Sequence, residues 1–397
     1  MRYYIIAGEA SGDLHGSNLV KELKKKDTGA IIRGWGGDRM QQAGTDLVKH
    51  YRDLAFMGFT EVIMNLRTIL RNLKFCKSDI LQFTPDVLIL IDYPGFNLRI
   101  AEWAKQQGFK VVYYISPQVW AWKENRVKKM KQHIDKMLVI LPFEKDYYKN
   151  KWQWEVEYVG HPLVEVVESF RMDAGNKQLT IGNMQLANEL PGNQQGLTDT
   201  VLPIANCPLP VIALLPGSRK QEILKKLPVM LEASKSFPGY QFVVAKAPGQ
   251  EDSFYSSILS QYPNVKSVPD QTYALLMASA AALVTSGTAT LETALFGVPE
   301  VVCYKGSNIS YQIAKRLVKV KYISLVNLIM DKPVVKELIQ RELTIENLCH
   351  ELQEILTNDN RKAQLQADYK NLKKLLGEGG HASAKAAESI VRFLNTK

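Results

Sequence analysis

An acidic residue ends an apolar run in the first quarter of the sequence. Asp92 follows residues 87–91, VLILI, and Pro94 and Gly95 break the chain directly afterwards. A carboxylate at the end of a buried strand is partly removed from water, which raises its pKa and suits it to accept a proton. We interpret Asp92 as a general base, with a cap on the following helix as the alternative.

A second acid lies in the turn GEASGD, residues 8–13. Gly8 and Gly12 allow the backbone to approach a ligand, and Ser11 is expected to cap the following helix. Glu9 is then expected to point its carboxylate toward the ligand and to take part in catalysis. An ordinary strand-to-helix turn is the alternative.

A third cluster follows another apolar run, in the sequence LLPGSRKQE of residues 214–222. The backbone amides of Gly217 and Ser218 are expected to face a phosphate, and Arg219 offers it a charge-assisted hydrogen-bonding fork. The segment therefore predicts an anion-binding turn.

The sequence TSGTATLE, residues 285–292, repeats this design. Ser286, Gly287 and Thr288 start a predicted helix whose dipole favours an anion. Glu292 lies one turn into that helix and is expected to accept both hydroxyls of a ribose. Together with Arg219 these residues predict a pocket for a diphosphate and a ribose. The sequence lacks GxxxxGKS, which excludes a P-loop kinase or ATPase, and GWGGD at 34–38 is only close to the GxGxxG of nicotinamide-binding turns.

Aromatic residues follow another apolar run, in SPQVWAW at 116–122. Trp120 and Trp122 predict a rigid wall over the binding cleft, with core packing as the alternative. His161, in VGHP, follows the last apolar run of the first half, and both a structural and a catalytic role stay open for it.

Strand-like and helix-like segments alternate in two series. Continuous apolar strands separated by helices predict parallel sheets that are covered on both faces. The predicted strands are residues 3–8, 31–37, 86–92, 110–116 and 136–142 in the first series, and 211–218, 241–247, 265–269, 281–287 and 299–305 in the second. Basic residues 123–136 are read as one of the helices. The fold class is α/β, with two Rossmann-like doubly wound domains facing a cleft and with C-terminal helices.

Four segments follow from this pattern. Residues 1–170 form the N-terminal domain with the base, and residues 211–343 form the domain for the nucleotide. Between them, residues 171–210 are read as a linker or insertion because they are rich in Asn, Gln, Gly, Leu and Pro. The glycines at 377, 379 and 380 split residues 344–397 into two helices, which pack on the N-terminal domain or on a partner subunit.

Composition narrows the class of protein further. The 397 residues carry a net charge of +10, which favours anionic partners. The four cysteines form no CxxC pair, so neither a metal site nor a disulfide framework is expected, and the cytoplasm is the expected location. No signal peptide or membrane-spanning run is recognised.

A nucleotide-sugar pocket and a carboxylate base together indicate sugar transfer. One carboxylate that deprotonates an incoming hydroxyl fits direct displacement with inversion. Arg219 and a helix dipole would stabilise the diphosphate that leaves, so neither a metal nor a cofactor is expected.

The sequence resembles the lipid-A-disaccharide synthase family in the order and spacing of its motifs. The resemblance covers nearly the whole chain except residues 177–210. The motifs that carry it are AGEASGDLHG, LAFMGFTEV, PDVLILIDYPGFN, ISPQVWAWKENRVKKM, LPFEKDYY, VGHPL, LLPGSRKQEI, SGTATLE and KYISLVNLI.

The resemblance implies a type-B glycosyltransferase fold and a specific reaction. A 2,3-diacylglucosamine unit passes from its UDP conjugate to 2,3-diacylglucosamine 1-phosphate, which gives the β-1,6-linked disaccharide 1-phosphate of lipid A and UDP. It also implies that Asp92 is the base and that Glu9, Arg219, Glu292 and Asn327 lie in the active cleft, with Asn327 bonded to nucleotide or substrate. The family motif IDxPDFN has an acid where this sequence has Gly95, which concentrates the prediction on Asp92.

An acylated substrate requires a surface that contacts acyl chains or the membrane, and residues 56–75 are a candidate for it. Phe59, Ile63, Leu66 and Leu70 follow helical spacing in this segment, with Arg67 and Arg71 expected on the other side. The pattern predicts a helix in the bilayer interface or a groove for acyl chains, with core packing as the alternative. We therefore expect a cytoplasmic protein, monomeric or dimeric, bound peripherally to the inner membrane.

Two other classes of protein compete with this interpretation. A UDP-N-acetylglucosamine 2-epimerase would share the fold and the pocket but would not need a lipid-facing stripe. A nucleic-acid-binding protein would explain the basic charge, but no RNP, KH or helix-turn-helix signature is present.

Overall fold

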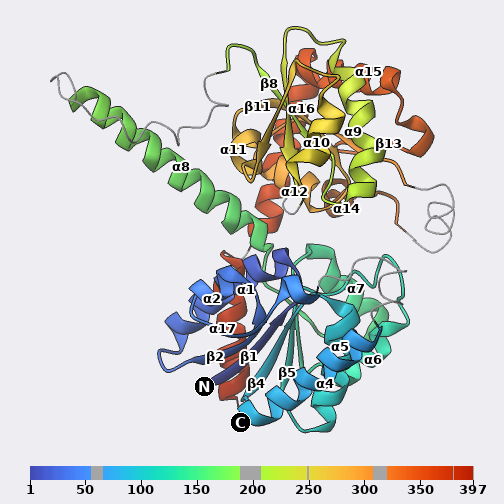
Figure 1. The fold of residues 1–397 in the computed structure, drawn as a ribbon. Coiled ribbons are helices and arrows are strands. Elements are labelled where there is room, and N and C mark those ends of the chain that lie inside the picture. The colour runs from blue at the N-terminus through green and yellow to red at the C-terminus, as the bar shows by residue number, and fades with distance from the viewer. Residues whose placement is uncertain (55–65, 188–206, 248–249, 307–319, 379, 397) are drawn as a thin grey trace. The chain divides into compact units, whose positions relative to one another are not determined.

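The computed structural model describes residues 1–54, 66–187, 207–247, 250–306, 320–378 and 380–396. The chain forms two compact units (Figure 1). Unit 1 comprises Met1–Pro162 and Leu376–Lys397, and unit 2 comprises Leu163–Leu375. The division after Pro162 falls before the expected boundary at residue 170, and the chain returns to unit 1 only near its end.

Unit 1 contains a seven-stranded parallel sheet in the order β3-β2-β1-β4-β5-β6-β7. Its strands are β1 (Arg2–Ala7), β2 (Ile31–Gly36), β3 (Asp46–His50), β4 (Val87–Ile91), β5 (Val111–Tyr114), β6 (Lys136–Val139) and β7 (Glu157–Tyr158). The predicted strands are present. The edge strands β3 and β7 were not predicted.

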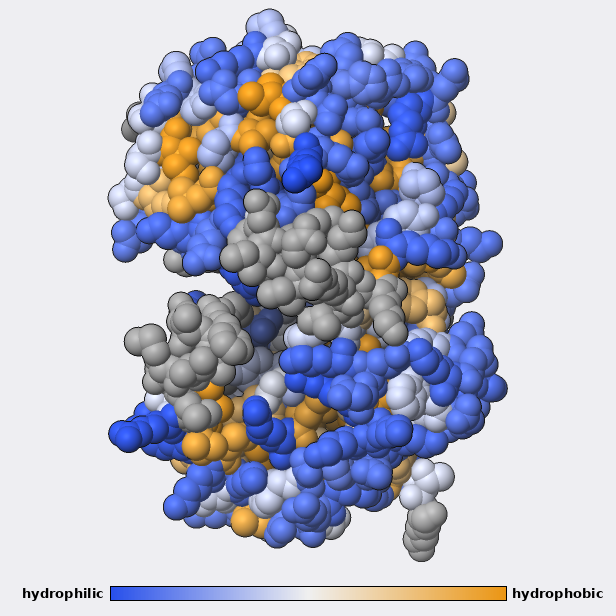
Figure 2. Space-filling model, turned by 90° about the vertical axis from the view of Figure 1, so that its right-hand side faces the viewer, coloured by the Kyte–Doolittle hydropathy of each residue, from blue (hydrophilic) through white to orange (hydrophobic). Residues whose placement is uncertain are grey.

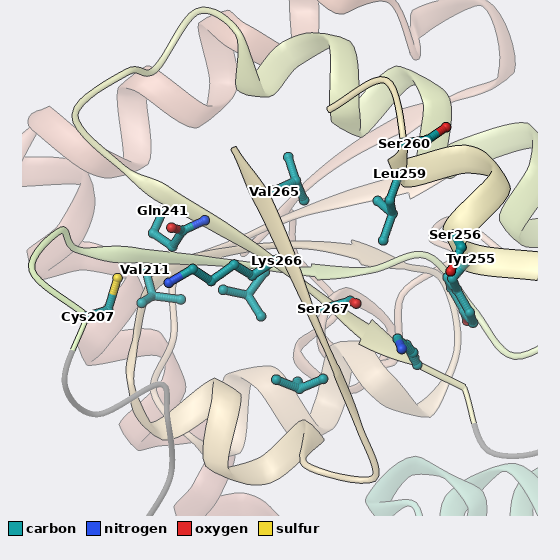
Figure 3. A pocket seen from close by; sticks show the side chains of 13 residues that line it. Cys207, Val211, Gln241, Tyr255, Ser256, Leu259, Ser260, Val265, Lys266 and Ser267 are labelled. Carbon is teal, nitrogen blue, oxygen red and sulfur yellow. The ribbon is translucent and has the colours of Figure 1, made fainter. Parts of the chain in front are cut away.

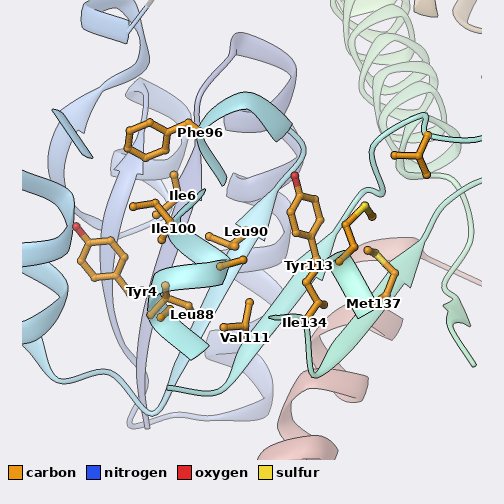
Figure 4. Close-up of a cluster of buried hydrophobic side chains, with 14 of the residues drawn as sticks. Tyr4, Ile6, Leu88, Leu90, Phe96, Ile100, Val111, Tyr113, Ile134 and Met137 are labelled. Carbon is orange, nitrogen blue, oxygen red and sulfur yellow. The ribbon is translucent and has the colours of Figure 1, made fainter. Parts of the chain in front are cut away.

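The central strands of unit 1 are buried on both faces, which explains their continuous apolar sequence. In β4, Leu88 and Leu90 join one core cluster (Figure 4), and Ile89 and Ile91 join the cluster on the opposite face. Alternate residues of a strand point to opposite faces, so an apolar run is what a sheet covered on both sides requires.

Helices cover both faces of this sheet. They are α1 (Ala10–Lys26), α2 (Asp38–Gln42), α4 (Leu66–Phe83), α5 (Pro94–Gln106), α6 (Arg126–His133), α7 (Pro142–Trp152) and α17 (Ala382–Asn395), with the 3-10 turn η1 (Tyr51–Leu54). The basic helix predicted over 123–136 is shorter, because Ile134 already has extended backbone and Lys136 begins β6. Ser11 does not cap α1, since the N-cap position is Glu9.

The last helix of the chain belongs to unit 1. α17 packs along α1 (Figure 1). Its side chains Ala386, Ala387 and Ile390 are fully buried in the core on that face. The C-terminal segment contains three helices, not the two expected, because a break at Asn358 precedes the glycines.

Unit 2 contains a six-stranded parallel sheet in the order β10-β9-β8-β11-β12-β13. Its strands are β8 (Val211–Leu215), β9 (Gln241–Lys246), β10 (Val265–Pro269), β11 (Ser279–Thr285), β12 (Glu300–Tyr304) and β13 (Lys336–Ile339). The sequence pattern ended the series at β12 and missed the edge strand β13. Both units thus have doubly wound sheets, which confirms the predicted fold class.

The helices of unit 2 include one that the sequence did not suggest. α8 (Pro162–Ala187) runs through the first part of the segment predicted as a linker. The others are α9 (Lys220–Ser234), α10 (Asp252–Leu259), α11 (Thr272–Met277), α12 (Thr288–Leu295), α14 (Leu325–Met330), α15 (Ile345–Thr357) and α16 (Asp359–Gly377), with the 3-10 turn η2 (Gln340–Glu342).

Candidate active site

Each sheet reverses its strand order at one point. In unit 1 this point lies between β1 and β4, and in unit 2 between β8 and β11. Ligands of open α/β sheets bind beyond the carboxyl ends of the strands at such a point. Glu9 and Asp92 follow the first pair of strands, and residues 216–219 and 286–288 follow the second. Within each unit the fold thus brings together residues that the sequence singled out separately.

The turns after β1 and β4 are in close contact. Ala7 pairs with Ile91 in the sheet, and a Cβ atom at Gly8 would lie only 2.3 Å from the Tyr93 ring. No larger residue fits at Gly8 without displacing that ring. The requirement for glycine explains the first residue of the GEASGD turn.

The Asp92 carboxyl has the environment that a general base needs. Burial, and to a lesser extent the negative charge of Glu9, raise its pKa from 3.8 to about 6, while a hydrogen bond from the Tyr93 amide opposes both effects. A carboxylate with such a pKa is largely ionised at neutral pH, yet it binds a proton more readily than an exposed aspartate does.

The backbone at Asp92 is held in an unusual conformation. Asp92 and Tyr93 have φ angles of 42° and 48°, a region that costs non-glycine residues about 1–3 kcal/mol each. The Asp92 carbonyl accepts hydrogen bonds from Asn97 Nδ2, at 2.8 Å, and from the Tyr113 hydroxyl, whose ring Figure 4 shows. The Asp92 amide donates to Tyr114 O at 3.1 Å. Asn97 and Tyr113 are therefore positioning residues that the sequence analysis did not assign, although Asn97 ends the quoted motif.

Asp13 has a structural role that the sequence analysis also missed. Its carboxylate is 3% exposed and accepts hydrogen bonds from the amides of Gly37, Arg39 and Met40, at 2.7, 3.2 and 3.0 Å. These amides lie at the amino end of α2, where backbone donors have no partner within the helix. Asp13 thereby ties α1 to the turn after β2.

The two tryptophans do not form one aromatic wall. Trp120 is partly buried: its indole N–H donates to Glu144 Oε1 at 3.2 Å, and its ring packs edge-on against Phe143. Trp122 is 46% exposed, with Lys123 Nζ 4.2 Å from its ring centroid. Trp120 thus has the packing role that was the alternative, and Trp122 alone remains a candidate for ligand contact.

His161 lies in the interior of unit 1. It is 4% exposed, and burial together with nearby His15 lowers its pKa to about 3. His15 is also buried, with a pKa lowered by burial to about 4. Both imidazoles are neutral at physiological pH, which favours the structural role for His161.

The turn after β8 has the features of an anion site. Gly217 has a φ of 112°, which favours glycine, and Ser218 and Arg219 are exposed. Arg219 occupies the N-cap position of the fifteen-residue helix α9, and its Nη1 lies 3.6 Å from Glu222 Oε1. The backbone donors of that helix end and the guanidinium both favour a negatively charged ligand.

The turn after β11 completes this half of the site. Gly287, with a φ of 140°, is the N-cap residue of α12, and Thr288 starts the helix at the surface. The Ser286 hydroxyl donates to Ile323 O at 2.9 Å, so its oxygen, but not its proton, is available to a ligand. Glu292 accepts a hydrogen bond from the Tyr273 hydroxyl at 3.1 Å, and burial raises its pKa.

Asn327 does not have the geometry predicted for it. It is 1% exposed, its Nδ2 donates to Val335 O and Glu337 Oε1, both at 2.9 Å, and its Oδ1 accepts from the Val335 amide at 2.9 Å. Glu337 in turn accepts from the Ile323 amide, and Ile323 O holds Ser286. Asn327 thus supports the turn after β11 from inside and does not reach toward a nucleotide.

The apolar stripe predicted over 56–75 is only partly within the described residues. Phe59 and Ile63 lie outside them. The helix α4 is described from Leu66 onward, and the Leu66 side chain is not among the described ones. Leu73 is in the core, but Leu70 is 57% exposed and shares the outer face of α4 with Arg67 and Arg71. The basic and apolar side chains therefore share one surface instead of lying on opposite sides.

A cavity of about 630 Å³ lies elsewhere in unit 2 (Figure 3). Strand residues such as Val211, Val265 and Lys266 line it together with Tyr255 and Leu259 of α10. No residue of the turns after β8 and β11 contributes to it, so we place no substrate there. Among the described residues no cluster of His, Cys, Asp and Glu could hold a metal ion.

Comparison with known proteins identifies the family. A family model described as lipid-A-disaccharide synthetase matches residues 3–196 and 187–391. The chain belongs to this family. The matched residues include the segment 177–210, for which the motifs had suggested no counterpart.

Full-length relatives agree with the family model. The lipid-A-disaccharide synthase of Syntrophus aciditrophicus is 38% identical over 392 residues, which cover 97% of this chain and 96% of the relative. That of Trichlorobacter lovleyi is 38% identical over 385 residues, 96% of this chain and 94% of the relative. The chain is accordingly a glycosyltransferase of lipid A biosynthesis.

Solved structures with similar folds are more distant in sequence. A UDP-GlcNAc 2-epimerase from Neisseria meningitidis bound to UDP-GlcNAc matches with a TM-score of 0.64 at 14% identity, over 99% of this chain and 100% of that chain. The calicheamicin glycosyltransferase CalG4 matches with a TM-score of 0.58 at 14% identity, over 100% and 98%. These similarities concern the fold, which is the type-B glycosyltransferase fold.

Proposed function

We propose that this lipid-A-disaccharide synthase homologue uses Asp92 as the base of an inverting glycosyl transfer. The acceptor is 2,3-diacylglucosamine 1-phosphate and the donor is UDP-2,3-diacylglucosamine. Asp92 takes the proton of the acceptor hydroxyl, the hydroxyl oxygen bonds to the anomeric carbon, and the bond from that carbon to the diphosphate breaks. The products are the β-1,6 disaccharide 1-phosphate and UDP.

One observation carries this assignment. The Asp92 carboxyl lies at the switch point of unit 1, and burial and Glu9 raise its pKa to about 6. A base whose pKa lies near the working pH combines a large ionised fraction with useful basicity. Glu9 acts in this scheme through its charge, which makes Asp92 more basic.

Unit 2 is proposed to bind the UDP part of the donor. The amides at the amino ends of α9 and α12 and the Arg219 guanidinium receive the diphosphate, and Glu292 receives the ribose. These groups stabilise the negative charge that develops on the diphosphate as it leaves. The exposed position of Arg219, Gly287 and Thr288 supports this role.

The outer face of α4 is proposed to rest on the cytoplasmic face of the inner membrane. Leu70, Phe75 and Leu81 of α4 are 57%, 47% and 48% exposed, and Arg71 and Lys74 of the same helix are exposed cations. Figure 2 shows that apolar and strongly hydrophilic side chains lie next to one another on the surface of the protein. Such a mixture suits an interface of acyl chains and anionic headgroups. Among the described helices none is long and apolar enough to span a bilayer.

The test is an assay of UDP release by the purified protein from UDP-2,3-diacylglucosamine, with and without the acylated 1-phosphate acceptor. We expect release only with the acceptor, together with a β-linked disaccharide product. Turnover of the donor without acceptor would instead indicate hydrolysis or epimerisation. A product that retains the anomeric configuration of the donor would contradict direct displacement.

A further inference from the structure

Lys226 of α9 is a buried cation with an incomplete set of partners. The residue is 3% exposed, and its Nζ donates one hydrogen bond, to Thr285 Oγ1. Its nearest carboxylate oxygen, Glu222 Oε2, lies 4.0 Å away. An ammonium group has three N–H donors, and the described residues of unit 2 provide no further acceptor for them.

The position of this cation relates it to both turns of the nucleotide half-site. Thr285 is the last residue of β11 and directly precedes the turn that starts α12. A Cβ atom at Gly217 would lie 3.4 Å from Thr285 Cγ2 and 2.8 Å from Glu222 Oε2. Thr285, Glu222 and Lys226 therefore form a cluster directly beneath Gly217, where the two turns meet.

The cluster has an excess of positive charge. Glu222 lies between two cations, with Oε1 3.6 Å from Arg219 and Oε2 4.0 Å from Lys226. One carboxylate cannot neutralise both, and a buried charge without a full complement of partners is costly. The amino ends of α9 and α12 add partial positive charge at the same place. A ligand with more than one negative charge would complete the arrangement.

We propose that Lys226 is a positioning residue for the diphosphate of the nucleotide sugar, acting from beneath the turns after β8 and β11. Its hydrogen bond to Thr285 ties α9 to the end of β11, and its charge adds to the field at the phosphates. Because Lys226 donates to Thr285 Oγ1, the Thr285 hydroxyl proton is directed elsewhere and is available to a phosphate oxygen. This inference rests on the proposed binding of UDP by unit 2 and extends it to a residue outside the motif's exposed turn.

The experiment compares phosphate-bearing and phosphate-free probes. Calorimetric titration of the full-length protein with UDP, UMP and uridine gives the dissociation constants for wild type and for Lys226→Met. We expect the UDP constant to rise about 10- to 100-fold in the variant, because the variant loses both the charge and the charge-assisted hydrogen bond that orients Thr285, and we expect the uridine constant to change less than about twofold. Lys225→Met, the same substitution at the exposed neighbouring residue, is the matched control and is expected to bind UDP as wild type does.

Protein stability separates this role from a merely structural one. Replacing an incompletely paired buried charge by a methionine of similar shape is neutral or stabilising, so the melting temperature of Lys226→Met should not fall. Equal weakening of UDP and uridine, or unchanged UDP binding, would overturn the inference. Failure of the wild-type protein to bind UDP would overturn the proposed function as well as this inference. A wild-type protein that binds UDP and a Lys226→Met variant that binds it equally well would overturn this inference alone.

Substitutions of Thr285 test the same inference independently if the Lys226→Met variant does not fold. Thr285→Val keeps the shape of the side chain but removes the oxygen that Lys226 contacts, whereas Thr285→Ser keeps that oxygen. We expect the valine variant to lose affinity for UDP but not for uridine, and the serine variant to bind UDP within about threefold of wild type. Wild-type UDP affinity in Thr285→Val would contradict a role for this contact.

Discussion

The Asp92 carboxyl combines a catalytic position with a cost to stability. Burial and Glu9 raise its pKa from 3.8 to about 6, so folding disfavours the charged form. Between about pH 4 and 6 the folded protein holds this proton more often than the unfolded chain does, and stability therefore falls as the pH rises through that window. Above pH 6 the whole cost is present, about 3 kcal/mol at 1.36 kcal/mol per pKa unit.

Replacing Asp92 by Asn should separate these two effects. We expect turnover to fall about 10²- to 10⁴-fold, the usual contribution of a general base. The free energy of unfolding should rise by up to about 3 kcal/mol at pH 8, and the difference from wild type should vanish near pH 4. Urea unfolding at both pH values and the UDP-release assay measure these quantities. Near-normal turnover in a folded Asp92→Asn protein would remove Asp92 from the mechanism.

Gly95 marks a departure from the family motif that can be tested by restoring the acid. Gly95 is exposed in the first turn of α5, and no atom lies within 4 Å of a Cβ placed there. Gly95→Asp should therefore stabilise the protein by about 1 kcal/mol, through helix propensity and the helix dipole. The added charge should also raise the Asp92 pKa and shift the acid limb of the activity profile to higher pH.

The matched control for that substitution is Gly95→Ala, which adds the side chain without the charge. It should give about 0.5–1 kcal/mol of stability and leave the acid limb in place. Thermal unfolding and the pH dependence of kcat/KM check both variants. A rise in turnover of Gly95→Asp by tenfold or more would mean that the second acid takes part in the chemistry, contrary to the present assignment.

The strands that sequence reasoning missed share one physical feature, although one edge strand, β10, was recognised. Strands inside the sheets are buried on both faces and were recognised as apolar runs. The missed strands β3, β7 and β13 are all at sheet edges, where a strand has one neighbour and carries polar residues such as Lys336 and Glu337. Their sequences resemble those of loops and helices, because an edge does not require a continuous apolar run.

The error at Asn327 has the same origin. Asn327 lies in the motif KYISLVNLI, and the family resemblance implied a role toward nucleotide or substrate for it. Its partners are Val335 and Glu337, and Glu337 belongs to the unpredicted strand β13. Without that strand, the hydrogen bonds that engage the Asn327 amide could not be foreseen.

The outer face of α4 gives a prediction at the scale of one element. Changing Arg67, Arg71 and Lys74 together to Gln should weaken binding to vesicles that contain anionic lipid by about 100-fold, since each cation contributes about 1 kcal/mol near such a surface. Vesicle sedimentation at several salt concentrations measures this loss. Lys370→Gln with Lys374→Gln, two exposed lysines of α16, is the control. Equal binding by the triple variant and wild type would exclude α4 as the contact.

At the scale of the whole molecule, the order of the elements along the chain differs from their order in space. The alternating pattern was sufficient to predict two doubly wound sheets, and each apolar strand indicated where its terminal loop would lie. The order of the strands in the sheet decides which of these loops lie next to one another. The return of α17 to unit 1 depends on the apolar face of α17, which has no packing partner close to it in the sequence. Ala386 and Ile390 mark that face in the sequence, but nothing near them in the chain identifies α1 as the surface they cover.

The two units have separate cores, which predicts separate responses to two perturbations. Ile390→Ala removes a fully buried side chain of α17 from unit 1 and should cost about 2–5 kcal/mol, or about 5–15 °C in the melting of that unit. UDP at 100 times its dissociation constant should stabilise unit 2 by about 2.7 kcal/mol. Differential scanning calorimetry should then show one transition lowered by the substitution and another raised by UDP. Glu388→Ala, at a position 62% exposed on the same helix, should leave both nearly unchanged. A single transition that responds to both perturbations would mean that the units unfold together, and a UDP response in the transition lowered by Ile390→Ala would place the nucleotide in unit 1.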